Sequence, residues 1–348
     1  DFATTFAIDL PSGLDADTGL PGPDAVVADF TLSITAPKTG FAADTAIDTV
    51  GRLVEIPLEI PIGGGDRTRR FLFPSTLRPR LQRRAYGCHK GAAGRVVVVA
   101  GSRGLAGASI LSALGASRGG AGLVTVCVPE EIYSIVASAA PAEAMVRAYR
   151  DFAEIAELPT DVFAVGPGLG AAPLPGLIDF LTREARPIVC DADALNALSR
   201  HPESIAALPP HRLLTPHPGE MARLLGTAPA DDRASVARRF ADGTGTTLLL
   251  KGSRTVIASP GHPLEFNTTG HPGMASGGMG DVLTGLCTAL VGQGHSLHDA
   301  ACIGSWLLGR AAELAVRDQR IAPESLSAPL VAEHLGAALL ALQTPESP

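Results

Sequence analysis

The sequence RVVVVAG at residues 95–101 decides the fold, because it is an uninterrupted β-branched run that ends in a glycine turn. Such a run is typical of a strand buried on both faces of a parallel sheet. Strands and helices alternate from residue 94 onward, which predicts an α/β fold with a mostly parallel sheet covered by helices on both faces. The further strands are expected at 122–129, 161–166, 186–192, 211–216, 246–252 and 255–259, and the clearest helices at 107–118, 130–138, 276–292, 296–317 and 327–342.

The first part of the chain has a different pattern. Residues 1–60 hold short apolar runs separated by turn formers, which indicates three strands with too little apolar content for an independent core. Residues 63–87 contain a glycine triplet, two prolines and seven arginines, and we interpret them as a solvated linker rather than a nucleic-acid-binding segment. The chain starts with Asp1 and Asp9 interrupts its apolar beginning, so we expect no signal peptide and a start within a domain.

The composition excludes several classes of protein. A chain of 348 residues with 46% hydrophobic and 18% charged residues is not disordered. A net charge of −7 and only 4% aromatic residues argue against a nucleic-acid partner. No apolar run approaches the ~18 residues of a membrane helix, so we expect no membrane partner. The five cysteines are scattered without a CxxC pair, which favours a cytoplasmic protein.

The most informative stretch for function is NTTGHPGMASGGMGDVLTG, residues 267–285, which runs directly into an apolar helix. Glycine-rich backbone at a helix N-terminus exposes N–H groups and the positive end of the helix dipole, which together favour an anion. Asp281 falls in the first helical turn, where it could deprotonate a substrate hydroxyl and direct it towards a phosphoryl group. The alternative is a glycine-rich turn in which Asp281 only stabilises the helix start.

Other polar residues follow predicted strands. Lys251 at a strand end could pair with a phosphate, and His217 could reach a ligand. Asp191 and Asp193 follow another strand, where they could hold Mg²⁺ through water or cap the next helix. Because the carboxyl ends of parallel strands meet at one edge of a sheet, one crevice could collect all of these side chains. The P-loop and HExxH motifs are absent, and the nine histidines show no metal-ligand spacing.

Several segments together resemble a known family, the ADP/ATP-dependent NAD(P)H-hydrate dehydratases of the ribokinase-like superfamily. The resemblance covers about residues 88–342 and implies a ribokinase-like three-layer fold. It further implies ADP-dependent dehydration of the S-epimer of hydrated NADH or NADPH to NAD(P)H, with release of AMP and phosphate. The matching segments occur in the family's order: HKGAAGRVVVVAGS, GGAGLVTVCVP, VGPGLG, DADALNAL, LTPHPGEMARLLG, LLLKGSRTVIA and NTTGHPGMASGGMGDVLTG.

The resemblance also implies roles for individual residues. Asp281 would be the catalytic base, and Mg²⁺ would accompany the phosphates of ADP or ATP. His271 stands where the family signature has Asn, and a homotetramer is expected. The anion hole would be formed by Gly277, Gly278, Met279 and Gly280; the hydrated dinucleotide would contact Ala108, Gly170, His217 and Asp281; and the nucleotide would contact Lys251, Gly252, Ser253, Arg254, Thr255 and Gly280.

Residues 1–62 resemble the C-terminal end of the Rossmann-like NAD(P)H-hydrate epimerase domain, which precedes the dehydratase in a bacterial bifunctional repair enzyme. The resemblance rests on AIDLPSGLDADTG and ADFTLSITAPKTGF. Asp9 and Ser12 match the substrate and potassium positions of that family. Most of an epimerase domain is missing, so we expect no epimerase activity. The expected organisation is an epimerase remnant at 1–62, a linker at 63–87 and a dehydratase domain at 88–342.

Three other functions were weighed against the dehydratase. A vitamin or sugar kinase of the same superfamily would share the anion hole and the base, but HPGE and KGSRT match the dehydratase better. A nucleotide-binding module without catalysis would have no need to keep Asp281. A dehydrogenase would be expected to carry an N-terminal GxGxxG motif, which is absent. The sequence leaves open the choice between ADP and ATP, and between NADH and NADPH hydrates.

Overall fold

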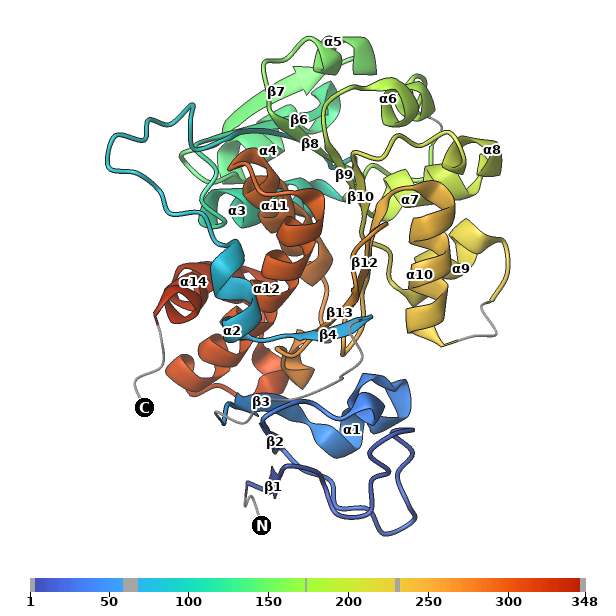
Figure 1. The fold of residues 1–348 in the computed structure, drawn as a ribbon. Helices are drawn as coiled ribbons and strands as arrows, with labels where there is room; N and C mark the ends of the chain where they lie inside the picture. Colours follow the sequence, from blue (N-terminus) through green and yellow to red (C-terminus); the bar gives the residue numbers. More distant parts are fainter. Residues whose placement is uncertain (1–3, 59–67, 173, 229–231, 345–348) are drawn as a thin grey trace.

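The computed structural model describes residues 4–58, 68–172, 174–228 and 232–344. A ten-stranded sheet forms the centre of these residues (Figure 1), and it confirms the predicted mostly parallel α/β fold. Strand β12 runs antiparallel to both of its neighbours, and the other pairs of adjacent strands are parallel. The order across the sheet is β4 (Arg69–Leu72), β13 (Leu264–Asn267), β12 (Val256–Ala258), β11 (Thr247–Leu250), β10 (Arg212–Leu214), β9 (Ile188–Cys190), β8 (Val162–Val165), β5 (Arg95–Val99), β6 (Leu123–Pro129) and β7 (Met145–Tyr149).

The β-branched run that opens the pattern lies inside this sheet, as expected. Strand β5 pairs with β6 on one side and with β8 on the other. Its residues Val96–Val99 are buried, and only Arg95 at the start of the strand is exposed. Burial on both faces explains why the run is continuously apolar rather than alternating.

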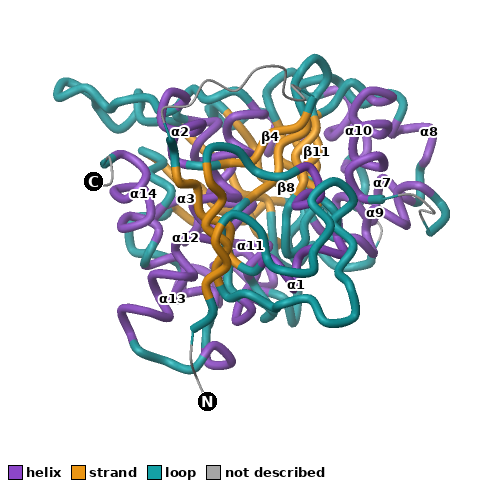
Figure 2. Tube along the Cα trace, turned by 60° about the horizontal axis from the view of Figure 1, so that its bottom comes forward, coloured by secondary structure: helices purple, strands orange, loops and turns teal. Residues whose placement is uncertain are grey.

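Helices cover both faces of the sheet (Figures 1 and 2). Among the described helices, none is long and apolar enough to cross a bilayer. One face carries α2 (Pro74–Leu77), α3 (Ala106–Arg118), α4 (Tyr133–Ala139), α11 (Met279–Gly292), α12 (Leu297–Gln319), α13 (Ala328–Glu333) and α14 (Leu335–Gln343). The other carries α5 (Phe152–Ala156), α6 (Leu177–Arg183), α7 (Ala192–Ser199), α8 (Pro202–Ile205), α9 (Pro218–Leu225) and α10 (Arg233–Thr244).

Residues 4–58 form a separate three-stranded parallel sheet, which we call the N-terminal sheet. It has the order β1 (Phe6–Ile8), β2 (Phe30–Ile34) and β3 (Arg52–Ile56), with helix α1 (Ile47–Val50) before β3. Its fully buried side chains, Phe41, Val50 and Leu53, belong to the same hydrophobic cluster as the core of the large sheet. The N-terminal sheet therefore shares a core with the rest of the chain, as its low apolar content suggested.

The structure corrects parts of the element assignment. Within the predicted linker at 63–87, the described residues 68–87 contain β4, which pairs with β13, and α2; burial of Phe71 and Leu72 explains why these residues form regular structure. The predicted boundary at residue 62 lies outside the described residues. Strands β7 and β13 were not predicted, because each is short and lacks a long β-branched run. The helix expected at 327–342 is divided at His334 into α13 and α14.

Candidate active site

The N-terminus of helix α11 carries the glycine-rich motif. Gly278 caps the helix with φ +90°, a left-handed conformation that favours glycine. Met279 and Gly280 begin the helix, and helical geometry leaves the N–H groups of this turn without intrahelical acceptors. A Cβ atom at Gly277 would meet open space. The four residues expected to form an anion hole thus lie at a helix N-terminus, where backbone dipoles favour a negative charge.

Asp191 connects three elements beside this helix end. Its side chain follows β9 and is 1% exposed. Asp191 Oδ1 accepts a hydrogen bond from Lys251 Nζ at 2.7 Å, and Oδ2 accepts one from Thr284 Oγ1 at 2.8 Å. A Cβ atom at Gly280 would lie 3.3 Å from Lys251 Nζ and 3.6 Å from Asp191 Oδ2. The ends of β9 and β11 therefore meet the first turns of α11, as the strand-end rule predicts.

This arrangement makes Asp281 a carboxyl group that can exchange a proton near neutral pH. Burial, and secondarily the negative charge of Asp191, raises the pKa of Asp281 to about 7, against an opposing effect of Lys251. For Lys251, burial acts to lower the pKa, but the carboxylates of Asp191 and Glu220 outweigh it and the pKa is raised. A charged ammonium thus stands beside a carboxyl group poised to act as a base.

His217 lies where the sequence placed it, directly after β10. It is the N-cap of α9, and its Nδ1 accepts hydrogen bonds from the N–H groups of Gly219 and Glu220 at 3.0 and 3.4 Å. Glu220 Oε2 in turn accepts from the N–H of His217 at 2.8 Å and lies 3.8 Å from Lys251 Nζ. Because Nδ1 accepts, the proton of the neutral imidazole is on Nε2, which lies 3.5 Å from Glu220 Oε1 in a half-exposed side chain.

The two other residues expected to contact the dinucleotide lie on adjoining loops. A Cβ atom at Gly168 would be 2.8 Å from Ala108 Cβ, so the start of α3 packs against the loop after β8. In that loop the N–H of Gly170 donates to Asp193 Oδ2 at 2.8 Å. Asp193 Oδ1 also accepts from Asn196 Nδ2 at 3.0 Å. Asp193 thus holds the loop after β8, a role that differs from both alternatives considered for it, Mg²⁺ binding and helix capping.

The segment 251–255 forms the turn between β11 and β12. Gly252 and Ser253 are exposed, and Thr255 Oγ1 donates to the carbonyl oxygen of Gly252 at 3.1 Å. The Arg254 side chain is only 4% exposed and lies over the Phe71 ring. A nucleotide contact by Arg254 would therefore have to come from its main chain.

His271, the departure from the family signature, keeps the local geometry of a capping residue. It is the N-cap of the short 3₁₀ helix 272–274, and its Nδ1 accepts from the N–H of Gly273 at 3.2 Å. The side-chain oxygen of Asn is a common acceptor at such a position. The exchange of Asn for His thus keeps a hydrogen-bond acceptor at the start of the glycine-rich segment.

Two residues of the site were not singled out from the sequence. Thr284 lies one helical turn after Asp281 and binds Asp191, and Glu220 closes the capping box of α9 and approaches Lys251. The signals that could have found them are helical spacing for Thr284 and the HPGE motif for Glu220.

The two residues with a predicted epimerase role lie in the N-terminal sheet. Asp9, with φ +67°, accepts from Lys38 Nζ at 2.6 Å and from the N–H of Ile34 at 3.1 Å. Ser12 is exposed. A cavity of about 360 Å³ lies beside Lys38, lined by residues 16–17 and 34–39. The potassium role of Asp9 and Ser12 remains a prediction.

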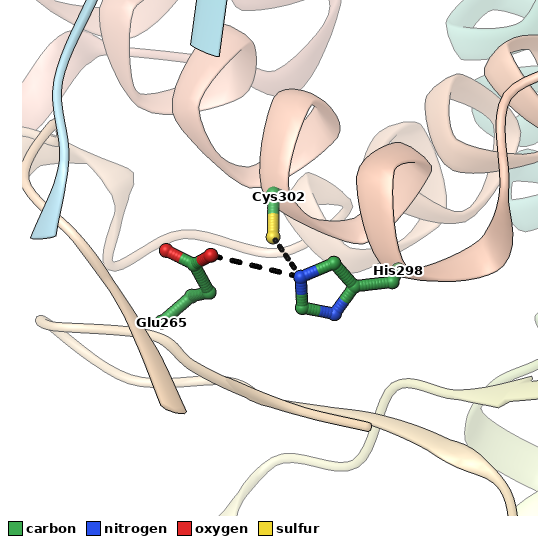
Figure 3. A group of neighbouring side chains, drawn as sticks. All are labelled: Glu265, His298 and Cys302. Carbon is green, nitrogen blue, oxygen red and sulfur yellow. Dashed lines mark hydrogen bonds and ion pairs between the residues drawn. The ribbon is translucent and has the colours of Figure 1, made fainter. Parts of the chain in front are cut away.

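Glu265, His298 and Cys302 form a separate buried cluster between β13 and α12 (Figure 3). The sequence did not lead us to predict this cluster, although His298 and Cys302 are four residues apart on one helix. His298 Nε2 lies 3.6 Å from Glu265 Oε1 and 3.7 Å from Cys302 Sγ, a spacing suited to a metal ion. However, Arg80 Nη2 lies 2.7 Å from the same carboxylate oxygen. The guanidinium therefore already neutralises Glu265, and the cluster is better described as a buried ion-pair network.

The mostly parallel sheet, with the glycine-rich helix N-terminus and the aspartate in its first turn, has a ribokinase-like α/β fold. A family model described as NAD(P)H-hydrate dehydratase matches residues 96–333, so the chain belongs to the NAD(P)H-hydrate dehydratase family. A second model, described as YjeF-related protein N-terminus, matches residues 2–40.

Individual relatives agree with this family. The chain is 41% identical to the bifunctional NAD(P)H-hydrate repair enzyme of Moorella thermoacetica, covering 90% of this chain and 63% of that protein. It is 37% identical to the ADP-dependent (S)-NAD(P)H-hydrate dehydratase of Neisseria meningitidis, covering 71% and 86%. It also resembles the ADP/ATP-dependent NAD(P)H-hydrate dehydratase of Bacillus subtilis co-crystallised with ATP/Mg²⁺, with a TM-score of 0.69, 29% identity and coverage of 78% and 98%. The chain thus spans less than two thirds of the bifunctional relative.

Proposed function

We propose that this chain catalyses the ADP-dependent dehydration of the S-epimer of hydrated NADH or NADPH, which restores the working cofactor. The observation that carries the proposal is Asp281, a carboxyl group with a pKa of about 7 in the first turn of α11, beside the Lys251 ammonium. Asp281 in the first turn of α11 would be the base, and Lys251 at the end of β11 would be a cation beside the transferring phosphoryl group. The family membership supplies the substrate class.

The chemistry is a phosphoryl transfer followed by an elimination. The Asp281 carboxylate accepts the proton of the hydrate hydroxyl, whose oxygen forms a bond to the terminal phosphorus of ADP while the bond from that phosphorus to AMP breaks. The C–O bond of the phosphate ester then breaks, phosphate leaves with both bond electrons, and loss of a ring proton restores the double bond. Residues 277–280 would stabilise the negative charge of the transferring group through backbone N–H groups.

The donor set fits a magnesium ion that is held mainly by phosphate oxygens and water. Both oxygens of Asp191 accept hydrogen bonds from protein side chains, and those of Asp193 accept from Gly170 and Asn196. Asp191 is nevertheless the carboxylate placed to orient a water ligand of such an ion. Bound Mg²⁺ would neutralise charge on the phosphoryl oxygens, and its preference for water and phosphate ligands agrees with this arrangement.

We assign the two ligands to the two sides of Asp281. The loops of Ala108 and Gly170, together with His217 Nε2, would contact the hydrated dinucleotide. The turn 251–255 and Gly280 would contact the adenine nucleotide. We further propose a cytoplasmic homotetramer, a compartment supported by the five free thiols, and no epimerase activity in this chain.

The test is to mix the purified chain with hydrated NADH, Mg²⁺ and either ADP or ATP, and to follow the near-ultraviolet absorbance of the reduced nicotinamide ring. A nucleotide-dependent rise is expected, and the faster reaction identifies the phosphoryl donor. No rise with either nucleotide, combined with phosphorylation of a hydroxymethylpyrimidine or a sugar, would replace the dehydratase by a kinase of the same fold.

A further inference from the structure

The N-terminal sheet lies directly against the turn that we assign to the nucleotide. Asp44, just before α1, pairs with Arg233 at the start of α10: Arg233 Nε lies 2.9 Å from both carboxylate oxygens, and Nη2 lies 2.5 Å from Oδ1. The Arg233 guanidinium in turn covers Gly252, where a Cβ atom would overlap with Nη1. Asp44 therefore fixes the group that packs on the main chain of the 251–255 turn.

A second contact reaches the start of the glycine-rich segment. Arg52 Nη1 donates to the carbonyl oxygen of Thr268 at 2.6 Å, and Arg52 Nε lies 2.5 Å from Glu313 Oε1. The same Glu313 oxygen accepts from the N–H of Gly270 at 3.0 Å. The Arg52 and Glu313 side chains are 17% and 13% exposed, so these charge-assisted bonds are largely shielded from solvent. Arg52 thus holds, directly and through Glu313, both ends of the turn 268–270.

Arg254, within the turn 251–255, makes a further contact between this turn and the N-terminal sheet. Its Nη2 lies 3.5 Å from the carbonyl oxygen of Gly51, and its buried Nε and Nη1 have no hydrogen-bond partner among the described residues. Burial and the charges of Arg52 and Arg233 lower the pKa of Arg254 to about 10, while Asp44 acts in the opposite direction. The charge of Arg254 is therefore tolerated at this interface partly because Asp44 is there. Figure 1 shows β3 and α1 beneath β4, β13 and α10; β13 leads into the turn 268–270, and α10 begins with Arg233.

From these contacts we propose that Asp44 and Arg52 are positioning residues of the nucleotide site. The N-terminal sheet would thus contribute to nucleotide binding by the dehydratase. Neither residue is among the ligand contacts that we assign. Asp44 holds the turn 251–255, and Arg52 holds the turn 268–270, from which the glycine-rich segment leads to Gly280; both backbones must be preorganised before the nucleotide binds. This inference rests on the proposed function, because it takes the 251–255 turn as the nucleotide contact.

The experiment compares Asp44→Asn and Arg52→Ala with Asp48→Asn in the full chain. Asp48 is an exposed aspartate on α1, and the described residues give it no ion pair, so Asp48→Asn matches Asp44→Asn in charge and location. The Kd for ADP is measured by calorimetry with Mg²⁺, and the KM for ADP and for the hydrated dinucleotide by absorbance. Thermal unfolding is followed in parallel.

We expect the Kd and KM for ADP to rise about five- to tenfold in Asp44→Asn and Arg52→Ala, a typical size for coupling between sites. The KM for the hydrated dinucleotide and all values for Asp48→Asn should stay at the wild-type level. Arg52→Lys should recover part of the loss, because Lys can pair with Glu313 but lacks a planar fork to reach the Thr268 carbonyl oxygen at the same time.

Two results would overturn the inference in distinguishable ways. If the wild-type chain binds ADP and the variants bind it equally well while unfolding at lower temperature, the two residues serve stability only and the proposed function stands. If the wild-type chain does not bind ADP, the proposed function fails, and the positioning role fails with it.

Discussion

Asp191→Asn is the substitution that tests the electrostatics of the site most sharply. Asn has nearly the same shape as Asp, and its amide can still accept from Lys251 Nζ and bind the Thr284 hydroxyl, the two partners at 2.7 and 2.8 Å. The change therefore removes one buried negative charge and keeps the local packing. Because that charge helps to raise the pKa of Asp281 to about 7, its loss must lower this pKa.

The order of the causes limits how far the pKa of Asp281 can fall. Burial is the larger cause and survives the substitution, so the pKa of Asp281 should fall by about one unit, or ~1.4 kcal/mol, rather than return to its ordinary value. A base works only when ionised, so kcat/KM for the hydrated dinucleotide rises with pH through this pKa. Near pH 6, the wild type should retain about a tenth of its plateau rate and Asp191→Asn about half.

The assay is the pH dependence of kcat/KM at saturating ADP for both proteins. The phosphates of ADP titrate in the same range, but equally in both measurements, so a difference between the two profiles belongs to the protein. Coincident profiles would refute the reasoning, because they would show that Asp191 does not act on the catalytic base.

Three further predictions concern the same site. Asp281→Asn should lower turnover by at least about 100-fold while calorimetry shows ADP binding largely unchanged, and wild-type turnover in this variant would remove Asp281 from the mechanism. Lys251→Ala should raise the KM for the nucleotide more than it lowers kcat. If steady-state kinetics instead show a larger fall in kcat than rise in KM, the ammonium acts mainly in the transition state. Asp281→Asn should also unfold at a higher temperature than the wild type above pH 7. Because the pKa of Asp281 is raised in the folded state, the wild-type fold loses stability as the pH rises from about 3.8 to about 7, by at most about 4 kcal/mol. If the wild type and Asp281→Asn have equal melting temperatures above pH 7, the carboxylate is not buried as described.

The sequence predicted the parts of the molecule that rest on local chemistry. The β-branched run 95–101 predicted a strand buried on both faces, and the glycine-rich stretch before Asp281 predicted the start of a helix. Strand-end residues such as Lys251 and His217 could be placed near each other because parallel strands share an edge.

What could not be predicted depends on contacts between residues distant in sequence. The pairing of Asp191 with Thr284 joins positions 93 apart, and that of Arg52 with Glu313 joins the N-terminal sheet to α12. No local pattern encodes either pair. The linker prediction for 63–87 failed at β4 because seven arginines outweighed the short apolar run of Phe71–Phe73, whose burial depends on β13.

The most direct test of the central claim is the stoichiometry of the reaction with hydrated NADH and ADP. We expect one AMP and one phosphate for each reduced dinucleotide formed. In Asp281→Asn the amounts of all three products should fall together. Formation of the reduced dinucleotide without AMP, or of AMP without the reduced dinucleotide, would contradict coupling of phosphoryl transfer to dehydration at this site.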